Sequence, residues 1–139
     1  MSEKVRVAWV SQHTPLQAQI EKLEEWFGNN YTLHQIAQTF TSAEQVYEEL
    51  EQIHADIAIV VLPYSMTARL LDINRNNVVF LQPVMDKLHT CSPPCKDFNP
   101  KTDTWIKGRH YRFTGRYDQI IEVRVVRQPF NGANFTRSR

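Results

Sequence analysis

Small polar side chains and a histidine stand where two apolar runs of the chain end, at 5–11 and at 57–62. They are Ser11, His13 and Thr14 at the first run, and Tyr64 and Ser65 at the second. If both runs are parallel strands, their carboxyl ends meet at one edge of the sheet. Helices that start there present free N–H groups to an anion. We therefore expect a ligand site at this edge, with Ser11 and His13 as candidate catalytic residues and the other three as candidate ligand-binding residues.

A purely structural role is the alternative for this cluster, with Thr14 and Ser65 as helix caps and His13 as a turn residue. The chain contains neither Gly-x-Gly-x-x-Gly nor Gly-x-x-x-x-Gly-Lys-Ser/Thr. These glycine patterns let a backbone wrap a pyrophosphate or the phosphates of a nucleoside triphosphate. We therefore expect neither a nicotinamide nor a flavin cofactor, and any chemistry must come from His13 and the hydroxyls beside it.

Two histidines and the chain's two cysteines form a second candidate site. They are His89, Cys91, Cys95 and His110. Two thiolates and two imidazoles suffice for a tetrahedral structural zinc ion, which would also order the proline-rich stretch 84–107. The Cys-x-x-x-Cys spacing encloses two prolines and is not the commoner zinc spacing, so a Cys91–Cys95 disulfide or two free thiols stay open.

The net charge of +1 conceals a strong asymmetry along the chain. Residues 1–100 carry seven Lys/Arg and twelve Asp/Glu, whereas residues 101–139 carry nine Lys/Arg and three Asp/Glu. A basic C-terminal part interleaved with aromatic residues favours an anionic partner, RNA, DNA or a nucleotide. The candidate contacts are Lys107, Arg109, Arg112, Arg116 and Arg124. Alternatively, the basic part balances the acidic helices of the same molecule and the aromatic side chains fill the core.

Strand and helix patterns alternate through the first 83 residues. Strands are expected at 5–11, 31–40, 57–62 and 78–81. Between them, Thr14 and Gln17 form a capping box for a helix that ends at Gly28, and Ser42 with Gln45 begins a second helix. A short third helix is expected at 66–73, with Ser65 as its cap. Such alternation predicts a parallel sheet with right-handed crossovers.

The C-terminal half lacks the regular alternation of strand and helix patterns. No periodicity is visible over 84–107, and two strands are expected at 109–113 and 119–127 around a turn at Thr114-Gly115-Arg116. The second strand alternates apolar and polar residues, which is typical of an antiparallel strand at a sheet edge. Residues 131–139 are expected to be a flexible tail. We predict one domain over 1–139, with a parallel core at 1–83, a Pro/Cys loop at 84–107 and basic strands at 108–130.

The expected architecture is an α/β three-layer sandwich, Rossmann-like or flavodoxin-like, with a mostly parallel sheet and antiparallel C-terminal edge strands. A strand that ends in Ser-Gln-His-Thr-Pro, at 11–15, in such a small domain resembles the minimal nucleotide-sensing or ring-nuclease proteins of CRISPR systems. The resemblance covers about fifteen residues of a common unit and implies a nucleotide as ligand or substrate.

Three functions follow as hypotheses. The first is a small protein that binds a nucleic acid or nucleotide at the carboxyl edge and the basic strands. The second is a metal-independent phosphodiesterase or nucleotide hydrolase that uses His13 and Ser11. The third is a structural assembly protein, and in each case a homo-oligomer is expected.

No apolar run reaches the ~18 residues of a membrane span, and the strand pattern begins near Met1 without a signal peptide. We therefore expect a cytoplasmic protein with no membrane partner.

Overall fold

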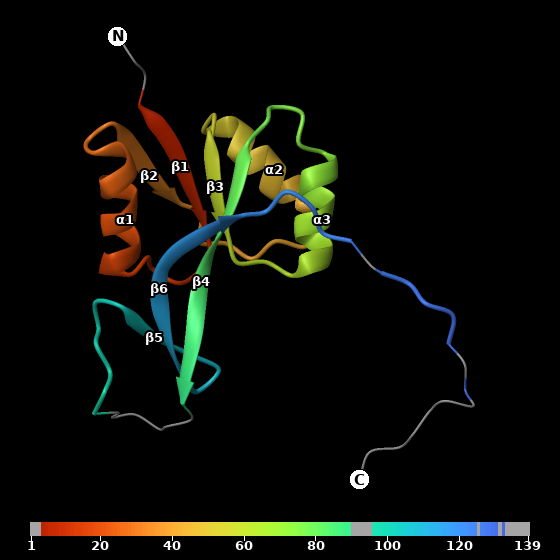
Figure 1. Cartoon of the computed structure of the whole chain (residues 1–139). Helices are drawn as coiled ribbons and strands as arrows, with labels where there is room; N and C mark the ends of the chain where they lie inside the picture. The colour runs from red at the N-terminus through yellow and green to blue at the C-terminus, as the bar shows by residue number, and fades with distance from the viewer. Residues whose placement is uncertain (1–3, 90–95, 125, 131, 133–139) are drawn as a thin grey trace.

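The computed structural model describes residues 4–89, 96–124, 126–130 and 132, which form an α/β fold with one mixed sheet of six strands and three helices (Figure 1). None of the described helices combines the length and apolar composition that a bilayer crossing needs. The elements are β1 (Val5–Val10), α1 (Gln17–Phe27), β2 (Tyr31–Gln35), α2 (Ala43–Gln52), β3 (Ile57–Val60), α3 (Tyr64–Asp72), β4 (Val79–His89), β5 (Asp103–Ile106) and β6 (Arg109–Gln119).

The sheet has the strand order β2-β1-β3-β4-β6-β5. The four N-terminal strands pair in parallel, as predicted from their alternation with helices. Strand β6 then runs antiparallel to both β4 and β5. The chain thus builds a parallel half and adds an antiparallel ribbon beside β4.

Helices cover both faces of the parallel half, which is consistent with three layers (Figure 1). Val7 and Trp9 of β1 pack on the α1 side, in the same cluster as Leu23 of α1. Ala8 and Val10 face the other way, into the cluster that includes residues of α2 and α3. Because β1 is buried on both faces, nearly every position in it is apolar.

The antiparallel strand β6 belongs to the same core. Phe113 and Tyr117 are buried in the cluster with Trp9 and Leu23. The Tyr117 hydroxyl also donates a hydrogen bond of 3.1 Å to the carbonyl of Gln19 in α1. The C-terminal ribbon is therefore attached to α1 by packing and by a buried polar contact, as well as to β4 by its hydrogen bonds.

Two of the three predicted helix caps are wrong. Helix α1 has Leu16, not Thr14, as its N-cap, because the Gln19 side chain accepts from the Leu16 N–H at 2.8 Å and so begins the helix two residues later. Ser65 does not cap α3 either, since Pro63 is the N-cap and its carbonyl accepts from the N–H groups of Met66 and Thr67. Ser42 caps α2 as predicted, accepting from the backbone of Gln45.

The C-terminal strand boundaries also differ from those expected. Strand β4 continues to His89 and β5 lies at 103–106, both inside the stretch predicted to be irregular. Strand β6 runs through 114–116, where a turn was predicted, because a bulge there sets one residue of β4 against three of β6 and Gly115 adopts a φ of +87°. Residues 120–124 lie in no strand, contrary to the prediction for 119–127.

The reversal of the chain lies instead between β5 and β6. Lys107 and Gly108 form a two-residue connection in which both φ angles are positive, 51° and 74°. Positive φ at both central positions is the geometry of a type I′ turn, whose twist matches that of paired strands. Glycine at the second position makes this turn accessible.

Replacing Phe113 tests whether the ribbon and the parallel half unfold as one domain. We expect Phe113→Ala to lower the free energy of unfolding by about 3–5 kcal/mol, because it leaves a cavity between β6 and α1. Unfolding in urea, followed by circular dichroism and tryptophan fluorescence, should keep one coincident transition. Gln119→Ala, at an exposed position of the same strand, is the control. Two separate transitions in the Phe113 variant would show that the ribbon is an independent unit.

Candidate ligand-binding site

A cavity of about 300 Å³ lies at the carboxyl ends of β1 and β3. Its walls come from the β1–α1 loop, the start of α1, the residue that follows β3, and the strands β4 and β5. The apolar lining residues are Trp9, Leu16, Val61, Pro83, Met85 and Ile106. The parallel half and the antiparallel ribbon therefore build this cavity together, at the edge where a site was expected.

The polar lining of the cavity consists of hydroxyls, amides and one imidazole. The residues that provide these groups are Ser11, His13, Thr14, Gln19, Gln82 and Thr104. Among the described residues, neither a lysine or arginine nor a carboxylate contributes to this lining. An apolar cavity with a few neutral hydrogen-bonding groups suits a planar, uncharged part of a small molecule.

Gln19 is the most deeply buried polar residue of this lining, with 4% of its surface exposed. Its Oε1 atom accepts from the Leu16 backbone, which fixes the orientation of the amide. Its Nε2 atom lies 3.8 Å from the sulfur of Met85. A thioether is a weak acceptor, so a carbonyl or ring nitrogen of a ligand would be a better partner for this donor.

The β1–α1 loop is held in one conformation by two side chains that the sequence analysis did not select. Trp9 Nε1 donates to the carbonyl of His13 at 2.8 Å. Gln35 Nε2 lies 3.2 Å from the carbonyls of both Ser11 and His13. The one signal in the sequence was a tryptophan immediately before the polar cluster, and its indole N–H needs a partner when it is buried.

Ser11 and His13 both face the cavity, but their recorded contact does not pair a nucleophile with a base. The Ser11 hydroxyl accepts from the backbone N–H of His13 at 3.1 Å. No hydrogen bond found in the described part of the chain joins the His13 ring to the Ser11 hydroxyl, which a base must reach to activate it. The arrangement offers a hydroxyl and an imidazole to a ligand, and catalysis by this pair stays a prediction.

A second cavity, of about 330 Å³, lies on the other side of the β1–α1 loop. Ser11, His13 and Val61 line both cavities and so form the ridge between them. Tyr64 and Ser65 lie in the first turn of α3 and are exposed, and neither belongs to the lining of either cavity. Of the five side chains expected at this edge, the structure brings together the three of the β1–α1 loop.

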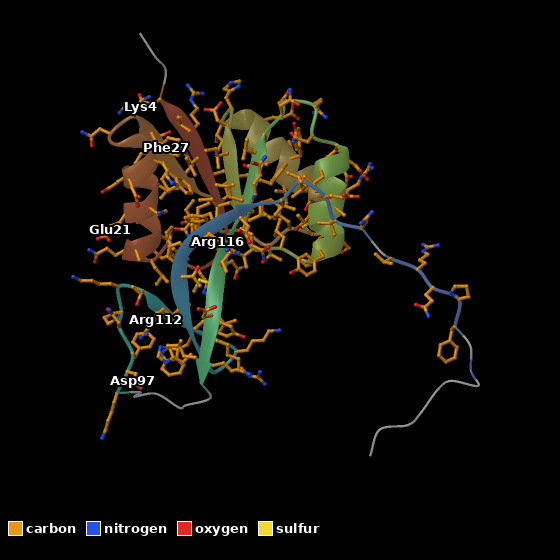
Figure 2. The ribbon with its side chains drawn as sticks, in the orientation of Figure 1. Lys4, Glu21, Phe27, Asp97, Arg112 and Arg116 are labelled. Atoms are coloured by element: carbon orange, nitrogen blue, oxygen red, sulfur yellow. The ribbon has the colours of Figure 1, made fainter. Side chains whose placement is uncertain are left out.

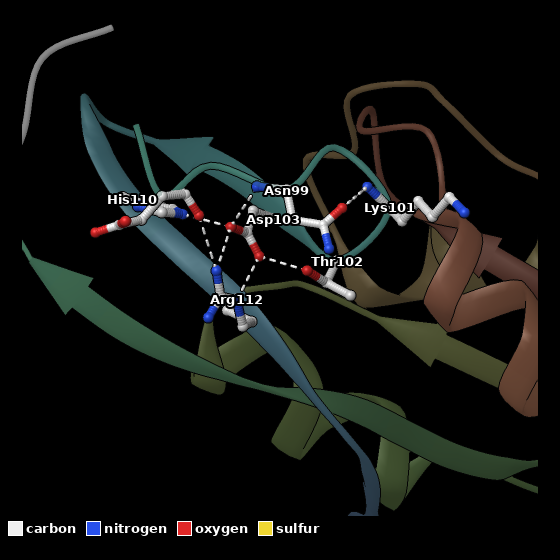
Figure 3. Close-up of polar contacts among 7 residues, drawn as sticks. Asn99, Lys101, Thr102, Asp103, His110 and Arg112 are labelled. Carbon is white, nitrogen blue, oxygen red and sulfur yellow. Dashed lines mark hydrogen bonds and ion pairs between the residues drawn. The ribbon is translucent and has the colours of Figure 1, made fainter. Parts of the chain in front are cut away.

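Two backbone N–H groups at the N-terminus of α1, where an anion was expected, already have partners within the chain. The N–H of Leu16 is bonded to the Gln19 side chain, and the N–H of Ala18 donates to the carbonyl of Lys101 at 3.0 Å. These contacts use two of the donors that would otherwise attract a phosphate. They also bring Lys101 next to the start of α1 (Figure 3).

One buried carboxylate, that of Asp103, organises the outer end of the ribbon (Figure 3). Arg112 binds it through two nitrogens, with Nε 2.7 Å from Oδ1 and Nη2 2.9 Å from Oδ2. His110 Nε2 lies 2.6 Å from Oδ2. The Thr102 hydroxyl and the Asn99 backbone complete the set, at 2.6 and 2.9 Å. Strand β5 and the preceding loop are thus fastened to β6.

The protonation of Asp103 is decided by these donors. Burial by itself raises the pKa of the Asp103 carboxyl, but the hydrogen bonds from Arg112 and the other donors outweigh it. The pKa of Asp103 therefore lies well below its usual range, and the pair with Arg112 in turn raises the pKa of that guanidinium. Asp103 is a charged structural anchor at neutral pH.

The five predicted nucleic-acid contacts are distributed along the ribbon and the chain that follows it. Arg112 is bound to Asp103 and to the carbonyl of Asp97, and both Arg112 and Asp97 are labelled at the lower left of Figure 2. Arg116 pairs with Asp118 at 2.9 Å and Arg124 lies 3.9 Å from Glu122. Lys107 and Arg109 are exposed at the β5–β6 turn, directly after Ile106 of the cavity wall.

Most aromatic residues interleaved with these basic residues already pack against other parts of the chain. Phe113 and Tyr117 fill the core, as the alternative interpretation held. Trp105 stacks on Phe98 with ring centroids 5.3 Å apart, and both rings contact His110. These side chains stabilise the ribbon, and base stacking on them is not needed to explain their positions.

The zinc prediction falls partly outside what the structure describes. Cys91 and Cys95 lie outside the described residues. His89 of β4 is the strand partner of His110 in β6, and His110 is fully buried beside Asp103. Among the residues whose placement is described, no group of three histidine, cysteine or acidic side chains could hold a metal ion.

Replacing Asp103 tests its role as an anchor. Because the pKa is lowered in the folded protein, ionised Asp103 stabilises the fold above its unfolded pKa of about 3.9, and this contribution is lost as the pH falls towards the folded pKa. We expect Asp103→Asn to lower the free energy of unfolding at pH 7 by about 3 kcal/mol. The difference in the free energy of unfolding between the wild type and Asp103→Asn should decrease as the pH falls from about 4 to about 2, measured by urea unfolding at each pH. Asp118→Asn, in an exposed ion pair, is the control, and an equal effect there would contradict the assignment.

Comparison with known proteins leaves this site to be interpreted from its own chemistry. A scan against protein-family models finds no match, and neither a search of curated proteins nor a search of solved structures finds a similar protein. A fold alone does not determine a function, because unrelated activities occur on the same architecture. The cavity, its neutral polar lining and the basic residues beside it are therefore the observations on which a function can be based.

Proposed function

We propose that the protein is a cytosolic, Rossmann-like nucleotide-binding protein, which holds the base of a nucleotide in the cavity at the carboxyl edge. The observation that carries this proposal is the buried amide of Gln19, whose Nε2 meets only a thioether among its described partners while it faces an apolar cavity. A base offers the carbonyl or ring nitrogen that this amide lacks, on a flat ring that fits between apolar walls.

The strand arrangement supports a ligand at this place. Strand β1 lies between β2 and β3, so the chain leaves β1 towards one side of the sheet and later returns on the other. In open α/β sheets, ligands bind outside the carboxyl ends of the strands at such a change of direction. Ser11 and His13 follow β1 and Val61 follows β3, which puts the cavity at that point.

Basic residues stand beside the cavity and not inside it. Lys101 lies next to the start of α1, and Lys107 follows the lining residue Ile106 at the β5–β6 turn. A neutral cavity with cations at its margin suits a ligand whose charge lies at one end, as the phosphate of a nucleotide does. The same residues could take the terminal nucleotide of an RNA or DNA strand.

Blocking the cavity tests the proposal. We expect calorimetric titration to detect binding of at least one of the common nucleoside monophosphates, and Val61→Trp to abolish it, because an indole at this ridge occupies the space at the mouths of both cavities. Val61 is 52% exposed, so the substitution should leave the fold intact. Leu88→Trp, on the outer part of β4, is the matched control. Absence of binding by the wild-type protein to nucleotides and to short RNA and DNA would overturn the proposal.

The charged end of the ligand is checked with the same titration. In Lys101→Glu/Lys107→Glu, affinity for the nucleotide should fall by roughly tenfold, a loss of about 1.4 kcal/mol, whereas affinity for the matching nucleoside should be unchanged.

Analysis of the reaction products distinguishes nucleotide binding from the hydrolase hypothesis. Turnover of a nucleotide or of RNA that His13→Ala abolishes would replace the binding function with the phosphodiesterase alternative.

A structural zinc ion is a second proposal, favoured by the contact between Asp103 and His110. Histidines that ligate a metal commonly donate their other ring nitrogen to a carboxylate, and His110 Nε2 lies 2.6 Å from Asp103. His110 would then be one ligand of a tetrahedral site, with His89, Cys91 and Cys95 as the other three. The metal would fasten the chain between β4 and β5.

Elemental analysis tests the zinc proposal. Protein purified without chelator should contain one zinc ion per chain, and Cys91→Ser/Cys95→Ser should contain none and unfold at a lower temperature. Ser2→Ala, at a position remote in sequence from the proposed ligands, serves as the control for handling losses. Wild-type protein without metal, or with a disulfide between the two cysteines by mass spectrometry, would contradict it.

A further inference from the structure

The chain that follows β6 has the composition of a strand, but no strand in the described part of the chain pairs with it. It leaves the sheet and runs past α3 (Figure 1). The sequence from 120 to 126 is Ile-Ile-Glu-Val-Arg-Val-Val, rich in β-branched residues that favour strands. Ile121 and Val126 are nevertheless 80% and 84% exposed.

The register between β4 and β6 explains why this segment does not pair with β4. The Ile120 N–H donates to the carbonyl of Phe80 at 2.8 Å, which continues the pairing of β6 with β4. Strand β4 begins at Val79, so beyond Ile121 there is no further residue of β4 for β6 to face. A strand-forming sequence therefore extends past the end of its own sheet, and no strand among the described residues pairs with it.

We propose that this segment pairs, antiparallel, with the same segment of a second copy of the protein, about a twofold axis at Val123. A twofold interface places the same patch on both subunits, so each contact occurs twice. In this register Glu122 of one copy lies opposite Arg124 of the other, and the reverse. Ile120 lies opposite Val126, and Val123 lies opposite its own counterpart.

Charge selects this register from its neighbours. A twofold axis at Glu122 would set the two glutamates against each other, and an axis at Arg124 would do the same with the two arginines. A parallel pairing in register would oppose like charges at both positions. Only the axis at Val123 gives two pairs of opposite charge, and directly opposite like charges destabilise a sheet.

Burial supports the same pairing. Glu122 and Arg124 have 64% and 74% of their side chains exposed and lie 3.9 Å apart, so each is accessible to a partner across a ribbon. Pairing would set the exposed Val126 against Ile120 of the other copy and so bury part of its apolar surface. On this basis Arg124 serves an interface between copies, and the predicted nucleic-acid contact at this residue is not required.

Charge reversal tests the register directly. Wild-type protein should sediment as a dimer at low salt, where exposed charges are least screened. Glu122→Arg and Arg124→Glu each place like charges in opposition twice, so each variant alone should dimerise about tenfold more weakly or worse. Mixing the two variants should restore a dimer, now a heterodimer, because arginines on one copy then face glutamates on the other. The double variant Glu122→Arg/Arg124→Glu should dimerise like the wild type.

The control is Arg127→Glu, which in this register faces the neutral Gln119 and should leave dimerisation unchanged. At a protein concentration low enough for the wild type to be monomeric, thermal unfolding of all variants should match that of the wild type, because the altered side chains are exposed. A wild-type protein that stays monomeric at all concentrations would overturn the proposal. Equal weakening by Arg127→Glu, or single variants that do not recover on mixing, would overturn the register and with it the twofold ribbon.

Discussion

The carboxylate of Asp103 is the constraint on which the outer wall of the cavity depends. It is fully buried, and the guanidinium of Arg112 and the ring of His110 both bind it. This contact fastens β5 to β6 and fixes the loop in front of β5, so Thr104 and Ile106 stay in the cavity wall. The same loop supplies the Lys101 carbonyl that closes the N-terminus of α1. A charged group kept from water thus orders a short edge strand that would be marginal by itself.

The opposite wall is fixed by different means. Trp9 and Gln35 bind the carbonyls of the β1–α1 loop, and Gln19 both caps α1 and faces the cavity. Trp9 and Gln19 thus stabilise local structure and also line the cavity. A cavity whose lining is already held in place loses little conformational entropy when a ligand binds, which favours binding.

Local patterns predicted the N-terminal half well and the C-terminal half poorly. The strands at β1 and β3 are short apolar runs, and Ser42 with Gln45 caps α2 as its sequence indicates. At α1 the same reasoning chose Thr14, since nothing in the local sequence shows that the Gln19 side chain turns back to Leu16. The turn predicted at Gly115 is a bulge, because glycine permits positive φ in both and only the pairing with β4 distinguishes them.

The sequence by itself determined the α/β class, the order of the first four strands and helices, and the position of Ser11, His13 and Thr14 at the end of β1. These depend on periodicity and on adjacent residues, which a single stretch of chain contains. Tertiary structure alone decided that β4 continues to His89, that β5 and β6 form a ribbon, and that Gln19, Met85 and Thr104 meet Trp9 in one cavity. Strand pairing and cavity walls join residues far apart in the chain, so their energies depend on partners that no local pattern specifies.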